Sequence, residues 1–167
     1  MASGENLITF MAWDATPITL STQIARFKWV ESTTSYERHL SIEGDDVEYS
    51  QASFHGVMPE HYSGGGVTCT IMFTHTITGG TVTFNLAFRT LTSGETLDAA
   101  HTFAYNAVAA GVPSAIGEVG YDDITFTDGA DMDNVAAGDA FDMRWWRDPT
   151  TGGTGHSHVL AIVIKET

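Results

Sequence analysis

Alternation of apolar and polar residues is the dominant pattern along this chain. Within residues 67–77, core-forming side chains alternate with a threonine-rich set, which predicts a half-buried strand. The alternation resumes in residues 81–88 after Gly79 and Gly80, and a Gly-Gly pair between two such runs favours a hairpin. We therefore expect these two segments to be neighbouring antiparallel strands.

Shorter runs of the same kind occur along the rest of the sequence. The run at 158–165 is apolar on both faces, which is typical of a central strand covered on each side. Short helical turns are predicted at 95–101 and 131–137, where acidic residues begin each segment. Further strands are predicted at about 7–11, 25–31, 47–57, 102–108, 116–127 and 140–147.

About nine short strands separated by turns predict an all-β fold, a two-sheet antiparallel β-sandwich. A jelly roll of about eight to nine strands is the common solution at this size. The glycine-rich segments 64–66 and 152–155 are too short for interdomain linkers and are interpreted as loops. We expect a single jelly-roll domain at 25–167, preceded by an N-terminal arm or first strand at 1–24.

The strongly acidic composition of the chain narrows the classes of partner that it could bind. Seven Lys and Arg residues stand against 21 Asp and Glu, a formal charge of −14, so a phosphate backbone would be repelled and no nucleic-acid partner is expected. The N-terminal segment lacks the features of a signal peptide, and no apolar run is long enough to span a bilayer. We expect a soluble protein made in the cytoplasm, with no membrane partner.

Motifs for catalysis are missing from the sequence. Acid/base hydrolysis needs two carboxylates in a cleft, whereas adjacent acids after a glycine are typical of a solvated loop. Cys69, the single cysteine, excludes a disulfide framework, and its inward position predicts an inert buried thiol. We predict no enzyme and no catalytic residue; the acidic candidates that we weighed are Glu43, Asp45, Asp46, Glu48, Asp122 and Asp123.

Two groups of residues raise the question of a metal. His156 and His158, two apart on a strand, would point to one side and could share an ion, but no third ligand is identifiable. A calcium loop counted from Asp131 has Val135 at the fifth ligand position and Ala136 where a glycine is needed. We predict no metal and no cofactor, with a different calcium geometry left open for Asp128, Asp131, Asp133, Asp139 and Asp142.

A family resemblance comes from four segments in order: FHGVMPEHYSGGGV, VTFNLAFRTL, DITFTDGADMDNVAAGDAFDMRWWRDP and VLAIVIKET. This order resembles a family of small virion structural proteins of tailed bacteriophages, over about residues 25–167. The loop at 152–158 departs from the family, which often has acidic residues there. The most specific matches are Pro59, Tyr62, Gly64, Gly65, Gly66, Gly138, Asp139, Arg147 and Asp148.

The resemblance implies a jelly-roll module that decorates or cements a capsid or builds a fibre, usually as a homotrimer. The expected function is therefore a virion structural protein, most directly a capsid decoration protein, assembled in the host cytoplasm. Its partners would be copies of itself and the phage capsid or another virion protein. The matching residues are interpreted as fold signatures: Pro59 ends a strand, glycines permit a turn, and Asp148 caps local amides.

Apolar residues in the N-terminal segment are candidates for subunit or partner contact, namely Leu7, Phe10 and Trp13. The alternative function is a carbohydrate-binding or receptor-binding module of a phage fibre, which would use exposed aromatic residues. Because Trp145 and Trp146 are adjacent on a predicted strand, one points inward and the other outward. Trp146 and Tyr62 are the candidate aromatics for that alternative.

Overall fold

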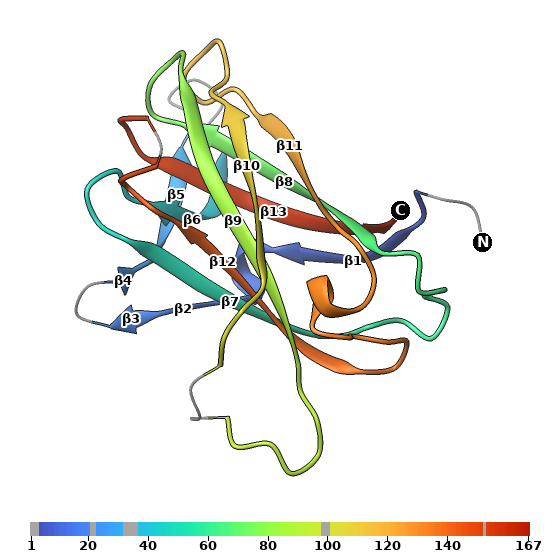
Figure 1. The fold of residues 1–167 in the computed structure, drawn as a ribbon. Helices are drawn as coiled ribbons and strands as arrows, with labels where there is room; N and C mark the ends of the chain where they lie inside the picture. Colours follow the sequence, from blue (N-terminus) through green and yellow to red (C-terminus); the bar gives the residue numbers. More distant parts are fainter. Residues whose placement is uncertain (1–3, 21–22, 32–36, 98–100, 152) are drawn as a thin grey trace.

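The computed structural model describes residues 4–20, 23–31, 37–97, 101–151 and 153–167, which form two packed antiparallel sheets (Figure 1). The six-stranded sheet has the order β11 (Gly120–Phe126), β8 (Val67–His75), β13 (Ser157–Glu166), β6 (Arg38–Gly44) and β5 (Arg26–Glu31), with β1 (Asn6–Met11) also paired to β13. The five-stranded sheet has the order β10 (Tyr105–Gly111), β9 (Thr81–Thr90), β12 (Ala140–Arg147), β7 (Ser50–Val57) and β2 (Ala15–Pro17).

The remaining elements are small. β3 (Thr19–Leu20) pairs with β4 (Gln23–Ile24), and the helical content of the described residues is two single turns, η1 (Ala12–Asp14) and η2 (Ala130–Met132). Within the described ranges, no helix has the length and apolarity needed to cross a membrane. The all-β, two-sheet antiparallel sandwich predicted from the sequence is confirmed. The structure has more strands than the eight to nine predicted, because β6 and the short strands β2, β3 and β4 were not recognised in the sequence.

The core lies between the two sheets and is rich in phenylalanine. Phe73 of β8 meets Phe84 of β9 with ring centroids 5.0 Å apart, and Phe88 meets Phe126 edge-on at the same distance. These side chains are at most 1% exposed. Burying each such ring stabilises the fold by about 2 kcal/mol, and Cys69 is buried among them as predicted.

The predicted hairpin of residues 67–77 and 81–88 is wrong. β8 pairs with β11 and β13 in one sheet, whereas β9 pairs with β10 and β12 in the other. The turn containing Gly79 and Gly80 therefore carries the chain from one layer to the other, and Figure 1 shows β8 and β9 crossing. A local alternating pattern specifies which face of a strand is apolar. It is compatible both with two strands hydrogen-bonded in one sheet and with two strands packed face to face in different sheets.

Several predicted boundaries shift for local reasons. β7 begins at Ser50 because the Asp45 carboxylate accepts hydrogen bonds from the Val47 and Glu48 amides, which makes a turn there. The helical turn predicted at 131–137 shrinks to η2, and in the one predicted at 95–101 residues 95–97 are not helical while 98–100 lie outside the described residues. The central position predicted for 158–165 is confirmed, because β13 lies between β8 and β6.

The N-terminal segment contributes to the sandwich. β1 pairs with β13, and Phe10, only 5% exposed, packs 5.5 Å from Phe54 in the core. Leu7 is partly buried against the same core, whereas Trp13 is 63% exposed. The intersubunit contact expected for Leu7, Phe10 and Trp13 stays a prediction, and residues 1–3 and 21–22 of this segment lie outside the described part.

Tyr62 and the glycines after it hold the chain as it enters β8. The Tyr62 hydroxyl donates to the Asp128 carboxylate at 3.0 Å and accepts from the Gly66 amide at 3.1 Å. Burial and the Asp128 hydrogen bond raise the pKa of Tyr62 to about 12. Gly64 and Gly66 have positive φ angles of 82° and 88°, as their predicted role in this turn requires.

Arg147 ties two loops to the end of β12. The residue is fully buried, and its guanidinium donates to the carbonyl oxygens of Gly44, Gly153 and Gly155, each at 2.7 Å. Next to it, the Asp148 carboxylate accepts hydrogen bonds from the amide and hydroxyl of Thr150. These contacts confirm that both motif residues act in the fold.

Candidate functional site

The outer face of the five-stranded sheet collects residues from four strands. The pairing register sets Trp146 of β12 beside Asn85 of β9 and Gln51 of β7, and Arg144 beside Ala87 of β9. Since alternate residues of a strand point to the same face, Trp145 is fully buried and Trp146 lies on the outer face, half-buried. The inward and outward directions predicted for this tryptophan pair are confirmed, with Trp146 the outward member.

Four aromatic side chains gather on this surface, which we call the aromatic face: Tyr49, Phe103, Tyr105 and Trp146. Tyr105 and Trp146 meet at 5.2 Å between ring centroids with an interplanar angle of 65°. The Trp146 indole also hydrogen-bonds to the side chain of Tyr49. At the far side, the Arg144 guanidinium lies 4.0 Å from the Phe103 ring centroid, an attractive cation–π geometry.

The surface is hollowed around these rings. Two adjoining hollows of about 280 and 340 Å³ share Tyr49, Tyr105 and Trp146 in their walls. Small side chains accompany the rings, because Ala107 lines one hollow and the fully buried Ala87 of β9 is paired with Tyr105 of β10. Polar groups line the same hollows, namely Gln51, Thr83, Asn85, Arg144, Asp148 and Thr151.

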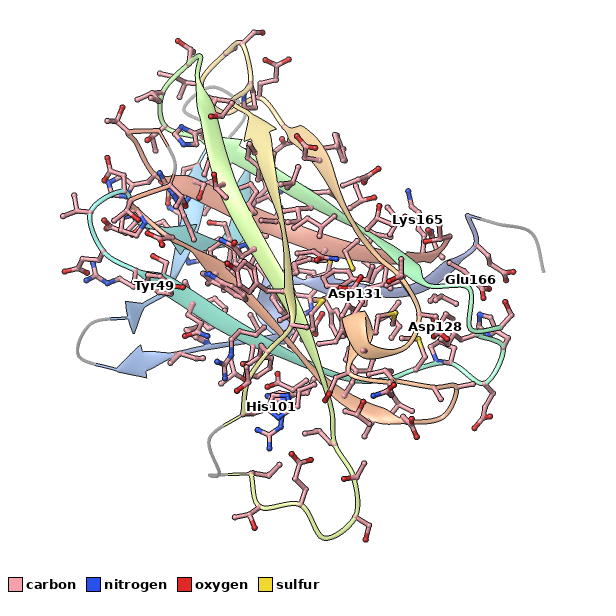
Figure 2. All side chains as sticks on the ribbon, in the orientation of Figure 1. Tyr49, His101, Asp128, Asp131, Lys165 and Glu166 are labelled. Carbon is pink, nitrogen blue, oxygen red and sulfur yellow. The ribbon has the colours of Figure 1, made fainter. Side chains whose placement is uncertain are left out.

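Hydrogen bonds and ring contacts hold the residues that line the hollows in place. Thr83 donates its hydroxyl proton to the Thr151 carbonyl, and the Asn85 amide donates to the Trp146 carbonyl at 3.3 Å. His101 packs 4.8 Å from the Phe103 ring and lies 3.6 Å from the Asp133 carboxylate. Figure 2 places Tyr49 just before β7 and His101 in the chain leading to β10, so these two residues come from separate loops.

The electrostatics of the face follow from partial burial. Burial and the nearby Asp148 charge raise the pKa of Tyr49, so its hydroxyl stays protonated at neutral pH. Burial lowers the pKa of Arg144, while the Asp142 carboxylate opposes that change. The face thus presents flat apolar rings with one guanidinium at one end and one carboxylate at the other, which suits a neutral ligand with apolar faces and hydrogen-bonding edges.

A larger hollow of about 620 Å³ lies at the outer side of the six-stranded sheet. Its lining includes Lys28, Trp29, His75 and His158. Burial and the nearby Arg147 charge lower the pKa of His75 to about 4, so this imidazole is neutral. Among the described residues of this lining Trp29 is the one large aromatic ring, and these residues form no stacked platform like that of the aromatic face.

Tyr62, one of the two aromatics predicted for sugar contact, is not on this surface. It is 5% exposed and is held by Asp128 and Gly66, so its prediction as an exposed binding residue is wrong. Both the ring and the hydroxyl of Tyr62 stabilise the fold. The sequence pattern alone does not distinguish such a buried tyrosine from an exposed one.

The acidic candidates for calcium separate in space. Asp131 accepts hydrogen bonds from the Thr127 amide and the Asn106 side chain, and Asp139 accepts one from the Ala136 amide. Asp128 binds Tyr62, Asp133 binds the Thr90 amide, and Asp142 lies 3.6 Å from His55. Each carboxylate is used in a separate local contact, so the stretch forms no shared oxygen cage among the described residues.

The other acidic and thiol candidates also have local roles. Asp123 accepts a hydrogen bond from the Thr70 hydroxyl on the neighbouring strand, and the Asp122 carboxylate accepts one from the Asp123 amide. Burial raises the pKa of the Cys69 thiol, which keeps it protonated and unreactive. His156 turns toward Asp45 and Asp46, whereas His158 faces the Ser41 hydroxyl, so this histidine pair does not converge as supposed.

Sequence reasoning found Trp146 but missed Tyr49, Phe103 and Tyr105. Phe103 and Tyr105 share the parity that places them on one face, a signal that was present in the run predicted at 102–108. Tyr49 was hidden because it precedes β7, in a segment predicted to be strand. Nothing local in the sequence predicts that β10, β9, β12 and β7 are consecutive neighbours, which is what unites these residues.

No protein-family model and no curated protein sequence matches the chain. Solved structures do match: the CBM22-1 xylan-binding domain from Paenibacillus barcinonensis Xyn10C has 9% identity and a TM-score of 0.50, with 99% of this chain and 97% of that chain covered. A carbohydrate-binding module from Cellvibrio mixtus lichenase 5A, in complex with cellotriose, has 11% identity and a TM-score of 0.47, with 98% and 99% covered.

At these identities the similarity concerns the fold. The match to the xylan-binding domain agrees with the jelly-roll sandwich predicted from the sequence. The match to the xylan-binding domain supports the jelly-roll part of the sequence resemblance and gives no support to its phage-specific part.

Proposed function

We propose that this protein is a non-catalytic β-sandwich module that binds a carbohydrate chain on the aromatic face. The observation that carries the proposal is the gathering of Tyr49, Phe103, Tyr105 and Trp146 around adjoining hollows on one sheet. A pyranose ring has an apolar C–H face that packs on aromatic rings and an edge of hydroxyls that needs hydrogen-bonding partners. The face offers both kinds of group.

The polar groups around the rings match that chemistry. Gln51 and Asn85 have amides that donate and accept, Thr83 and Thr151 have hydroxyls, and Arg144 donates only. Two adjoining hollows of about 280 and 340 Å³ favour a ligand of more than one sugar unit. The nature of the matched structures supports this choice over capsid decoration, which was the first expectation.

Attachment to a virion and trimer formation remain predictions drawn from the sequence resemblance. A sugar-binding module of a phage fibre would satisfy both the resemblance and the aromatic face. The acidic charge of −14 is compatible with that role, because neutral glycans are indifferent to it.

The test is a glycan array followed by calorimetry with the strongest ligand. We expect selective binding of one class of neutral oligosaccharide, and at least a tenfold weaker affinity for Trp146→Ala, since an aromatic anchor contributes about 2 kcal/mol or more. Trp29→Ala is the matched control, because Trp29 is an exposed tryptophan on β5 of the other sheet, away from the aromatic face.

Two results would contradict the proposal. One is an array with no selective glycan binding by the folded protein. The other is binding that survives Trp146→Ala but is lost in Trp29→Ala, which would move the site to the six-stranded sheet.

A further inference from the structure

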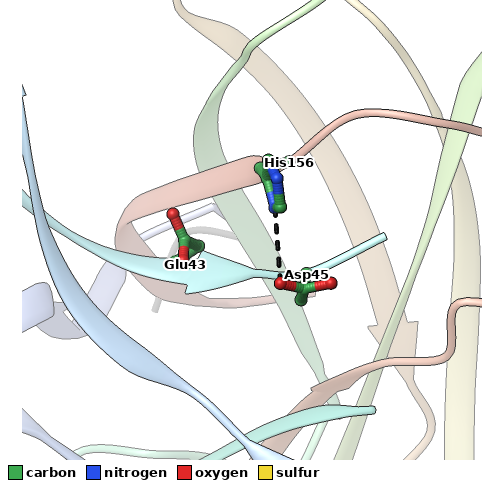
Figure 3. Close-up of side chains that lie close together, drawn as sticks. All are labelled: Glu43, Asp45 and His156. Atoms are coloured by element: carbon green, nitrogen blue, oxygen red, sulfur yellow. Dashed lines mark ion pairs between the residues drawn. The ribbon is translucent and has the colours of Figure 1, made fainter. Parts of the chain in front are cut away.

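We propose that Glu43, Asp45 and His156 form a binding site for a divalent transition metal ion of the zinc type. One ligand atom from each side chain lies within 4.8 Å of the others. Figure 3 shows the three side chains converging from β6, the turn after it and the loop before β13. Among the described residues, this is the group that brings three metal-ligating side chains together.

The individual distances fit a small ion. His156 Nδ1 and Asp45 Oδ2 are 3.6 Å apart, close to the spacing of about 3.3 Å between ligand atoms around a tetrahedral zinc with 2.0–2.1 Å bonds. Glu43 is only 8% exposed, and its carboxylate lies 3.7 Å from Lys28 Nζ, longer than a hydrogen bond. Small side-chain rotations would bring the three atoms around one centre.

A second, independent observation comes from the imidazole of His156. Its Nδ1 atom is buried and has no hydrogen-bond partner, although it points at a carboxylate. An unpaired buried nitrogen costs free energy that a metal ion would recover. Its other nitrogen, Nε2, lies 3.8 Å from Asp46 Oδ1, and a carboxylate behind a ligating histidine orients the ring.

The ligands are held by a well-connected scaffold. Gly155, next to His156, donates its amide to Asp46, and Arg147 donates to the carbonyl oxygens of Gly44 and Gly155. The Asp45 carboxylate is fixed by the Val47 and Glu48 amides. Burial opposes ionisation, but these hydrogen bonds keep the pKa of Asp45 below its usual value, so the ligand is charged at neutral pH.

The donor set selects the kind of ion. Calcium prefers six to eight oxygen ligands, whereas one imidazole with two carboxylates suits zinc and similar ions. A solvent molecule would complete a four-coordinate shell. The site joins the β6–β7 turn to the loop before β13, and it would hold these two segments together.

Titration calorimetry of the full chain without a histidine tag tests the site, with zinc chloride and calcium chloride as separate probes. We expect one zinc per chain, at least a hundredfold weaker binding for His156→Ala, and about tenfold weaker binding for Asp46→Asn. Lys28→Met should strengthen zinc binding severalfold, because a competing cation beside Glu43 is removed. Circular dichroism melts of each variant check that it is folded.

His55→Ala is the matched control, since His55 also lies 3.6 Å from a single aspartate, Asp142, and is not in the cluster. Zinc binding should be unchanged in this variant. Absence of zinc binding to the folded protein, equal zinc affinities of the wild type and folded His156→Ala, or a preference for calcium would each overturn the proposal. Carbohydrate binding does not depend on any of these results.

Discussion

Arg147 shows how one residue organises the loops beside the aromatic face. Among the described residues no carboxylate accepts a hydrogen bond from its buried guanidinium; three carbonyl oxygens accept from Nη1 and Nη2 instead, while Nε has no partner. Burial lowers its pKa, yet a guanidinium remains charged at neutral pH. The planar, forked guanidinium is therefore suited to reaching the three carbonyl oxygens at once.

We predict that Arg147→Met destabilises the protein by about 3 kcal/mol, because three buried carbonyls lose a charged donor. Arg147→Lys should recover little, since an ammonium cannot reach all three carbonyls from one point. Urea unfolding of the three proteins measures this. Equal stability of the lysine variant and the wild type would show that charge alone is sufficient there.

At the scale of elements, the segment from β7 to β8 contains two glycines at which an added side chain would destabilise the fold for different reasons. Gly64 and Gly66 both have positive φ, but a Cβ on Gly66 would lie 2.5 Å from the Phe126 carbonyl oxygen, whereas on Gly64 the nearest atom would be 3.8 Å away. The positive φ angle would therefore destabilise a substitution at either glycine, whereas the steric clash with Phe126 would occur only at Gly66.

Gly64→Ala should destabilise the protein by roughly 1 kcal/mol, the cost of a left-handed angle for a residue with a Cβ. Gly66→Ala should cost clearly more, since β11 must also shift. Thermal unfolding of both variants tests the difference. Equal losses would mean that the loop relaxes freely away from Phe126.

The elements also show what the sequence can and cannot predict. Period-two alternation located β1, β5, β8, β9, β12 and β13 within a few residues, and it gave the inward and outward sides of Trp145 and Trp146 correctly. It failed on the β8–β9 pairing, because strand neighbours are chosen by long-range packing. The aromatic face depends on that long-range order, so only Trp146 was found.

At the scale of the whole molecule, two buried histidines make stability depend on pH. His75 is 2% exposed, and burial together with Arg147 lowers its pKa from 6.5 to about 4. Burial also lowers the pKa of His158. Both are neutral in the folded protein, whereas the unfolded chain takes up their protons as the pH falls below 6.5.

We therefore predict that the free energy of unfolding falls as the pH is lowered from 6.5 to 4. His75 should account for up to about 3 kcal/mol of that loss. His75→Asn keeps an acceptor for the Ile77 amide and does not titrate, so its stability should fall less over this interval. Urea unfolding at several pH values gives the comparison. The same slope in both proteins would exclude His75 as the cause.

The most direct test of carbohydrate binding at the aromatic face is a nuclear magnetic resonance titration of the ¹⁵N-labelled protein with the strongest glycan from the array. The chain has four tryptophans, and Trp146 is the one on the aromatic face. We predict that the Trp146 indole signal shifts with ligand while those of Trp13 and Trp29 stay in place. A saturable shift at Trp29 or Trp13, with Trp146 unmoved, would contradict the account.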